Sequence, residues 1–397
     1  MTQQLPYWRL SAFYFFYFGL LGTWLPYWSL YLKSLGYSSG EIGILSALVM
    51  VTKVIAPNIW GYLADRYDCR TRIIRLGSLM AILAFAGVFW RQDFYWLAAV
   101  VVGYSFFWNA VLSQFDVLTL SHLSGRYARY SLIRVWGSIG FIVAVLAVGA
   151  WLDYHPIAHL LLIITGLLTA IWLGSLLVAE NPQGLSCGDR SPGSLRRILS
   201  KPAVLAFFAT SFLLQFSHGP YYTFFSIYLE GEGYSTTATG MLWSLGVLAE
   251  VLLFMGMHRL LARFSLRHIL IASLALTALR WWMIAEFAAS TALLIVAQCL
   301  HAASFGSAHA AAVETIRRFF TAHHGQGMAL YSGLSFGAGG AMGALFSGYA
   351  WDISARYSFW VAAAAAALAA WLAWRYFETP TTSADANQRS APTAGVD

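Results

Sequence analysis

The sequence predicts an all-α membrane protein in which twelve transmembrane helices form two pseudo-symmetric six-helix bundles. Three observations lead to this prediction: the composition, a succession of membrane-length apolar runs, and a repeat that relates the two halves. Of the 397 residues, 59% are hydrophobic and only 10% are charged. Because a soluble domain carries about 25% charged residues, this chain is too apolar to cover a surface in water. Helices suit a lipid environment because each satisfies its own backbone polar groups.

Apolar runs, separated by glycine, proline and charged residues, divide the chain into segments long enough to span a bilayer. The twelve predicted helices are residues 10–32, 42–64, 73–90, 95–121, 132–152, 157–178, 203–229, 238–262, 267–286, 290–315, 326–350 and 357–377. A polar linker, 179–202, separates an N-terminal bundle (1–178) from a C-terminal bundle (203–377). The polar tail, 378–397, is expected to be disordered and cytoplasmic.

The distribution of cations predicts the orientation. They concentrate in the even-numbered connections between the predicted helices, which hold Arg66, Arg70, Arg72, Arg75, Arg126, Arg129, Arg190, Arg196, Arg197, Lys201, Arg259, Arg263, Arg267, Arg317 and Arg318. Odd-numbered connections hold only Lys33, Arg91 and Arg356. The positive-inside rule therefore predicts that both termini and the central linker are cytoplasmic. This topology accounts for the net charge of +7 without a nucleic-acid partner.

The two halves contain similar segments at a nearly constant offset. YLKSLGYSS (31–39) matches YLEGEGYST (228–236), and the same offset places Gly43 on Gly240 and Lys53 on Glu250. Six-helix halves repeated in the same orientation are typical of transporters whose substrate site lies near the bilayer midplane, between the repeats.

Six charged side chains lie inside the predicted helices: Lys53, Asp116, Arg134, Glu250, Arg280 and Glu314. A charge at the bilayer centre costs about 2.5–3.5 kcal/mol on insertion scales, so such residues usually face a bundle interior or a wet cavity. Three positive and three negative charges indicate an internal polar pathway, as in a transporter of a small molecule. The sequence has no Walker loop, nucleophile elbow or metal-ligand cluster, so we expect neither a cofactor nor a catalytic centre.

The connection after the second predicted helix, GYLADRYDCRTR (61–72), resembles the signature loop of the major facilitator superfamily. The resemblance implies a gating latch made by Gly61, Asp65, Arg66 and Arg70. This sequence has Tyr67-Asp68 where the family has a glycine, so the turn can differ. Ordinary positive-inside charge is an alternative explanation of the arginines alone.

Asp116 precedes Arg134 by 18 residues, and Arg134 opens the segment RVWGSIGF. This arrangement is similar to the sugar–proton symporters related to lactose permease, in which such a carboxylate and arginine pair at the substrate site. The resemblance implies that Asp116 and Arg134 bind substrate. The alternatives are an interfacial arginine and a counter-charge at a helix end.

Arg280 and His301 resemble an arginine and histidine that the same family uses for proton coupling. For an aromatic acid, Arg134 or Arg280 is the expected partner of the carboxylate. The family has a carboxylate one turn after the histidine, where this chain has Ser304. We therefore expect a proton to be carried by another group: Glu250, Glu314, His301 or Lys53. Burial favours the neutral form of a carboxyl group, and histidine titrates near neutral pH. A hydrogen-bonded core residue is the alternative for His301.

Tyr17 and Trp108 are candidates for stacking on a substrate ring, with an interfacial belt as the alternative. Over the whole chain the sequence resembles the phenylpropionate permease group of the superfamily, through YLKSLGYSSGEIG, GYLADR, RVWGSIGF, LAEVLLF and HAASFGSAHAAAVE. That resemblance implies proton-coupled uptake of a small aromatic carboxylate by a monomer in a bacterial cytoplasmic membrane. The alternatives are a sugar or nucleoside symporter, a drug exporter, and a membrane-embedded enzyme or sensor.

Overall fold

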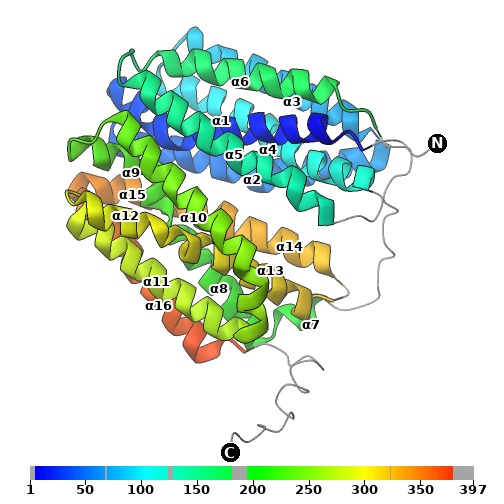
Figure 1. Cartoon of the computed structure of the whole chain (residues 1–397), viewed down its shortest axis with the longest axis vertical. Coiled ribbons are helices and arrows are strands. Elements are labelled where there is room, and N and C mark those ends of the chain that lie inside the picture. The colour runs from blue at the N-terminus through cyan, green and yellow to red at the C-terminus, as the bar shows by residue number, and fades with distance from the viewer. Residues whose placement is uncertain (1–4, 68, 124–127, 181–194, 322, 379–397) are drawn as a thin grey trace, which may run out of the picture.

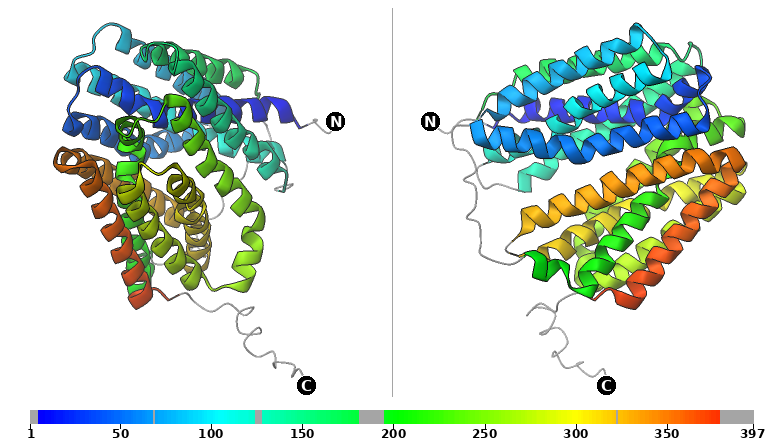
Figure 2. Two further views of the ribbon diagram at one scale, coloured as in Figure 1. Left: turned by 60° about the vertical axis from the view of Figure 1, so that its left-hand side comes forward. Right: turned by 180° about the vertical axis from the view of Figure 1, so that it is seen from behind.

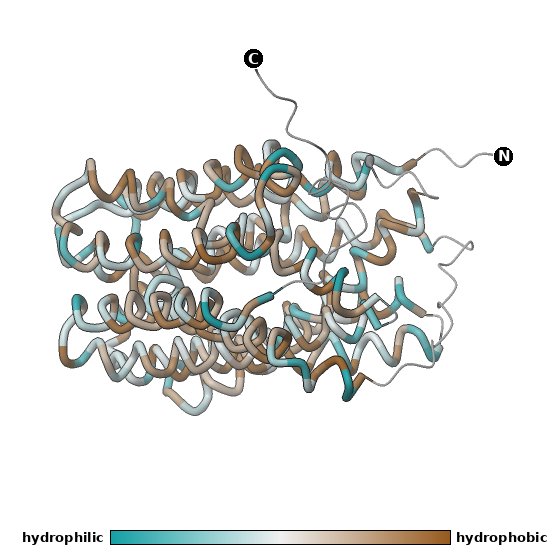
Figure 3. Tube along the Cα trace, turned by 90° about the horizontal axis from the view of Figure 1, so that it is seen from below, coloured by the Kyte–Doolittle hydropathy of each residue, from teal (hydrophilic) through white to brown (hydrophobic). Residues whose placement is uncertain are grey.

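The computed structural model describes residues 5–67, 69–123, 128–180, 195–321 and 323–378, and these form helices and connections without a strand. Most of the predicted linker and all but the first residue of the predicted tail lie outside the described residues. Hydrophobic residues occupy most of the helix shafts in Figure 3, as expected for helices surrounded by lipid.

The first half contains six long helices and one short continuation. They are α1 (Tyr7–Ser34), α2 (Ser39–Tyr67), α3 (Arg70–Ala86) with η1 (Gly87–Phe89), α4 (Phe94–Leu123), α5 (Ala128–Leu152) and α6 (His159–Leu176). Each begins within a few residues of its prediction, because the apolar runs that define the helices are bounded by polar and glycine-containing turns.

The second half starts with the short α7 (Leu195–Leu199) and then contains helices of which three are interrupted. They are α8 (Pro202–Ser217) and α9 (Gly219–Gly231), α10 (Thr236–Arg263), α11 (Leu266–Phe287), α12 (Thr291–Cys299) with η2 (Ala302–Ser307) and α13 (Ala308–Phe319), α14 (His324–Tyr331) with η3 (Ser332–Gly339) and α15 (Gly340–Ile353), and α16 (Ala355–Tyr376). The single predicted helix 203–229 is divided at His218, just before Pro220, which has no N–H to donate. The η2 and η3 segments are π-helical, a geometry common at functional sites.

Nine helices of the described chain are long and apolar enough to cross a membrane. The first helix α1, the pair α8–α9 and the interrupted α14–η3–α15 complete an arrangement consistent with the twelve predicted helices. Figure 1 shows the two halves as two helical bundles lying against each other, and Figure 2 shows the same division from two other sides. The halves meet where α2 packs against α15 and η3, α5 against α10, and α1 against α9.

These contacts occur at positions that the sequence repeat makes equivalent. Gly36 and Gly233, which occupy equivalent positions, both have φ of +86°, a conformation that glycine adopts without steric cost. The two turns they form lead into the equivalent helices α2 and α10. Consequently the α2–α15 contact and the α5–α10 contact are equivalent interfaces of the two bundles.

Glycines bring the bundles together at the end of the molecule that carries Lys33 and Glu230, which we call the arginine-poor end. A Cβ at Gly43 would lie 2.9 Å from the carbonyl oxygen of Ala344, and one at Gly240 would lie 2.7 Å from that of Val145. The opposite end, which carries Arg66, Arg70, Arg263 and Arg317, is the arginine-rich end.

Polar contacts join the bundles at the same arginine-poor end. Lys33 Nζ lies 2.7 Å from Glu230 Oε2, and these two residues are equivalent in the repeat. Asp153, after α5, accepts hydrogen bonds from the backbone N–H of Thr236 at 2.8 Å and of Thr237 at 3.2 Å. Its carboxylate therefore satisfies N–H groups at the start of α10. The arginine-poor end is closed by close packing together with these bonds.

We predict that Gly240→Leu opens the α5–α10 interface, because the added side chain has no room against Val145. Overpacking costs about 1–3 kcal/mol, so hydrogen–deuterium exchange at the ends of α5 and α10 should accelerate about tenfold or more. Gly256→Leu, on the same helix, is the control, since nothing lies within 4 Å of a Cβ there. Equal exchange in both variants would contradict the assignment.

Candidate functional site

A cluster in the first half surrounds Asp116. Asp116 Oδ1 accepts hydrogen bonds from the hydroxyl of Tyr14 on α1 at 2.6 Å and of Tyr130 on α5 at 3.0 Å. Arg134, one turn further along α5, lies with its guanidinium carbon 4.0 Å from the ring centre of Phe18 and 5.2 Å from that of Tyr14. The carboxylate is thus held by two tyrosines, and the guanidinium by two aromatic faces.

No ion pair within 4 Å joins Arg134 to a carboxylate of the described residues. The expected Asp116–Arg134 pair is therefore not formed in this conformation, although the tyrosines connect the two groups. A guanidinium presents five N–H donors in a planar fork that suits carboxylates. Among the described residues, no carboxylate lies within ion-pair distance of that fork.

Aromatic rings form a wall beside this cluster. The Tyr17 ring stacks on that of Trp108, with centroids 5.0 Å apart, and Trp108 stacks on Tyr104 at 5.7 Å. The Tyr17 hydroxyl also donates to the Trp108 carbonyl oxygen at 3.3 Å. Tyr17 and Trp108 are buried inside the bundle, so they are not residues of an interfacial belt.

The second half contains a more deeply buried cluster around Arg280, whose side chain is completely shielded from solvent. Its guanidinium donates to Ser304 Oγ at 2.9 Å and to Gln298 Oε1 at 3.2 Å, and lies 3.0 Å from His301 Nδ1. The rings of Tyr221 and Trp281 flank it at 4.3 and 4.4 Å. All these neighbours are uncharged or only conditionally charged, which is an unusual environment for a buried cation.

His301 connects this cation to a carboxylate. Its Nε2 atom lies 3.6 Å from Glu250 Oε2, which makes a continuous chain from Arg280 through His301 to Glu250. Close packing positions the chain, because Gly246 of α10 leaves room for His301, and Gly306 of η2 leaves room for Glu250. An imidazole between a guanidinium and a carboxylate can respond to protonation of the carboxylate and thereby change its contact with the guanidinium, which stays charged.

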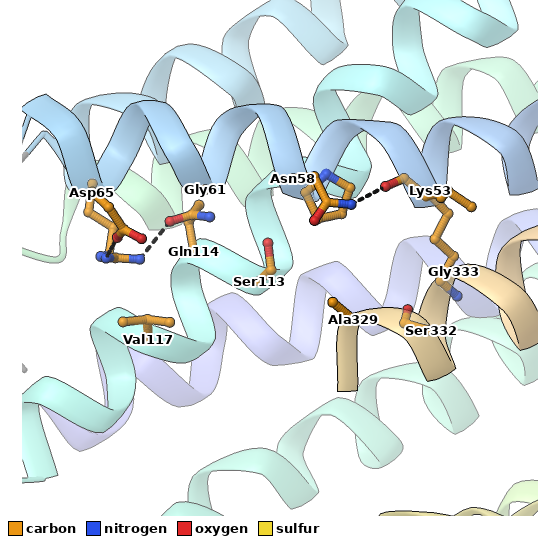
Figure 4. Close-up of a pocket in the computed structure, with 13 residues that line it drawn as sticks. Lys53, Asn58, Gly61, Asp65, Ser113, Gln114, Val117, Ala329, Ser332 and Gly333 are labelled. Atoms are coloured by element: carbon orange, nitrogen blue, oxygen red, sulfur yellow. Dashed lines mark hydrogen bonds and ion pairs between the residues drawn. The ribbon is translucent and has the colours of Figure 1, made fainter. Parts of the chain in front are cut away.

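A cavity of about 430 Å³ opens between the bundles toward the arginine-rich end. Figure 4 shows α2 along one side, with Lys53 at one end of the cavity and Asp65 at the other. Residues of α4, α14 and η3 complete its walls, among them Ser113, Gln114 and Ser332. The two bundles are therefore in contact at the arginine-poor end and separated by a cavity at the other.

The predicted latch residues line the mouth of this cavity in part. Arg70 lies 2.5 Å from Asp65 and donates to Gln114 Oε1 of α4 at 2.7 Å, and Gly61 lies beside the same glutamine. Arg66 instead donates to Tyr62 on the exposed side of α2. The structure brings Gly61, Asp65 and Arg70 together and leaves Arg66 outside the group.

Glu314 lies apart from the Glu250 chain. It pairs with Arg317 at 2.6 Å and Arg318 at 2.9 Å, near the arginine-rich end of α13. Lys53 likewise lies at the cavity and not beside Glu250. Of the four groups considered for proton binding, only Glu250 and His301 contact each other.

Sequence reasoning did not single out Tyr130, Gln114 or Gln298, which complete these clusters. Gln114 and Gln298 are buried amides within apolar runs. Burial of an amide is unfavourable unless it is hydrogen-bonded. An amide within an apolar run therefore indicates a buried hydrogen-bonded site, and this could have identified both residues from the sequence. Nothing in the sequence distinguishes Tyr130, because a tyrosine near a helix end is common.

Two six-helix bundles around buried, opposed charges, closed at one end and hollow at the other, define a multi-pass membrane transporter. Comparison with protein families agrees: residues 7–361 match the model of the MFS_1 like family. The chain belongs to this family of the major facilitator superfamily and is a secondary transporter, not an enzyme.

Among proteins with similar sequences is one of Escherichia coli (strain K12) described as a "probable 3-phenylpropionic acid transporter", 31% identical over 91% of this chain and 96% of that protein. A maltose permease of Geobacillus stearothermophilus is 30% identical over 87% of this chain and 89% of the permease. Among solved structures, a point mutant of the nucleoside transporter NupG superposes with a TM-score of 0.83 at 18% identity, covering 94% of this chain and 100% of that one.

We predict that Tyr130→Phe destabilises the first bundle, because it removes one of two hydrogen bonds to Asp116. The expected loss is about 1–2 kcal/mol, measured as a lower melting temperature in detergent. Tyr104→Phe is the matched control: the Tyr104 hydroxyl is buried and has no hydrogen-bond partner among the described residues. A loss in Tyr104→Phe as large as that in Tyr130→Phe would refute the role given to Tyr130.

Proposed function

We propose that this protein couples the uptake of a small aromatic carboxylate, such as 3-phenylpropionate, to proton entry. The observation that carries the proposal is Arg134: a partly buried guanidinium between aromatic rings, which makes no ion pair within 4 Å among the described residues. A bound carboxylate would complete its charge pairing, and the ring of the ligand would find aromatic surfaces nearby.

Tyr17 and Trp108 supply the aromatic surface on the Arg134 side, and Asp116 holds Tyr14 and Tyr130 by hydrogen bonds. Arg280 is the buried cation of the second half, although it is not the repeat equivalent of Arg134. The similarity to a protein described as a probable 3-phenylpropionic acid transporter supports the same ligand class. A sugar or nucleoside is the second candidate, supported by the similarity to a maltose permease and by the common fold with NupG.

Glu250 and His301 are the proposed proton-binding pair. Glu250 lies at the boundary between the bundles, with 18% of its side chain exposed, and its charge attracts that of Arg134 across the boundary. Protonation of Glu250 would remove that attraction and would alter the contacts that link Glu250 through His301 to Arg280. Proton binding on one bundle is thereby linked to the cation that binds substrate on the other.

The arginine-rich end is proposed to face the cytoplasm, by the positive-inside rule. The cavity beside Lys53 and Asp65 then opens inward, and the contacts of Gly43, Gly240 and Asp153 close the outer side. Substrate release on the cytoplasmic side is consistent with this arrangement, and the chain is proposed to act as a monomer in a bacterial inner membrane.

The test is uptake of labelled 3-phenylpropionate into vesicles with an imposed inward proton gradient. Arg134→Gln should lower uptake about tenfold or more, since a charge-assisted interaction with the carboxylate is lost. Arg129→Gln is the control, an exposed arginine on the same helix. The native chain could instead fail to take up 3-phenylpropionate and take up maltose or uridine. That result would contradict the aromatic acid as substrate and support a sugar or nucleoside.

Glu250→Gln should separate transport from proton coupling, because an amide cannot carry the proton. We expect accumulation driven by a proton gradient to disappear while exchange of labelled for unlabelled 3-phenylpropionate persists. Glu286→Gln, at the end of α11, is the control and should leave accumulation unchanged. Persistent proton-driven accumulation in Glu250→Gln would exclude Glu250 as the proton carrier.

A further inference from the structure

Lys53 is a cation at the middle of α2 for which the structure shows no acidic partner among the residues it describes. It lies at the inner end of the cavity, and its side chain reaches from α2 toward η3 of the other bundle (Figure 4). Within the described part of the chain its ammonium group has neither a salt bridge nor a hydrogen bond, and it lies 5.3 Å from the centroid of the Phe336 ring. A charge at this depth is costly unless water or an anion accompanies it.

The ring that Lys53 contacts belongs to an aromatic cluster. Phe336 lies with its centroid 5.6 Å from Tyr331, 6.0 Å from His309 and 6.1 Å from Phe305. His309 is also within 3.2 Å of the Tyr331 hydroxyl. Lys53 thus places a positive charge against one ring of an aromatic cluster.

The Lys53 cavity is distinct from the site around Asp116. Ser113, Gln114 and Val117 of α4 line the cavity, whereas Asp116 of the same helix is bonded to Tyr14. A stacked column leads from the Arg280 cluster toward the cavity: His301 lies 5.7 Å from Phe305, and Phe305 lies 6.0 Å from His309, with interplanar angles of 10° and 12°.

We propose that Lys53 binds the carboxylate of the substrate at a second position, which the ligand occupies between the Arg134 site and the arginine-rich end. This inference rests on the proposed function for the ligand class. At this second position the Lys53 ammonium pairs with the carboxylate, and the apolar part of the cavity lining lies against the ring of the ligand.

The lining of the cavity suits a monocarboxylate with a ring. Asp65 is neutralised by Arg70, so Lys53 is the one unpaired charge among the lining residues that the structure describes. Apolar surface for a ring comes from Val54, Pro57, Val117 and Ala329. A volume of about 430 Å³ lies within the range of small-ligand pockets, about 300–1,000 Å³.

The experiment uses Ser113→Cys as a reporter in the full chain with its three cysteines replaced by alanine. The rate of alkylation by N-ethylmaleimide is measured in detergent against increasing 3-phenylpropionate, with the neutral analogue 3-phenylpropan-1-ol as control. We expect 3-phenylpropionate to protect the reporter and the alcohol to protect it far less. Lys53→Met should raise the half-protecting concentration about tenfold or more, and Lys53→Arg should restore it.

The variant Arg134→Gln tests whether the ligand has two binding positions, at Arg134 and at Lys53, or only one. Protection of the reporter should persist in this variant even where uptake is lost. Loss of protection in Arg134→Gln, no effect of Lys53→Met, or equal protection by acid and alcohol would each overturn the second position. If Lys53→Met does not fold, as judged by its melting temperature, the comparison of acid with alcohol decides. Absence of uptake by the native chain would instead count against the proposed function.

Discussion

Burial of charge in an apolar helical bundle is the constraint on which this structure depends. A cation or carboxylate within the bilayer is unstable unless it finds hydrogen bonds, ring faces or an opposite charge. Asp116 finds two tyrosine hydroxyls, and Arg280 finds a serine, a glutamine, a histidine and two aromatic rings. These requirements determine which helices must lie together, because each set of partners comes from several helices.

The repeat gives the molecule two equivalent interfaces, but its charges are not equivalent. Lys33 and Glu230 occupy matching positions and meet in an ion pair at the closed end. Lys53 and Glu250 also match, yet one lies at a cavity and the other in a chain with His301. The two interfaces therefore share their packing but differ in the charges that they carry.

Local helix geometry also differs between the two halves. The π-helical η2 contains Ser304, which accepts a hydrogen bond from Arg280, and η3 contains Ser332 and Phe336 beside Lys53. A π segment leaves backbone groups less regularly bonded than an α-helix does, and such segments are frequent at functional sites. Both π-helical segments described in this chain lie in the second bundle and adjoin a cation: η2 adjoins the buried Arg280, and η3 adjoins Lys53, which is exposed at the cavity.

The sequence by itself determined the class of the protein: its apolar runs predicted the helices, and its repeat predicted the two bundles. It also identified Asp116, Arg134, Glu250 and Arg280, since a charge within an apolar run stands out in any window. Only the tertiary structure decided the partners of these charges. Asp116 is bonded to Tyr14 and Tyr130 instead of Arg134, and Glu314 pairs with its own helix. The physical reason is that hydropathy acts along one helix, whereas hydrogen bonds between helices depend on their rotation and separation, which the packing of the whole bundle sets.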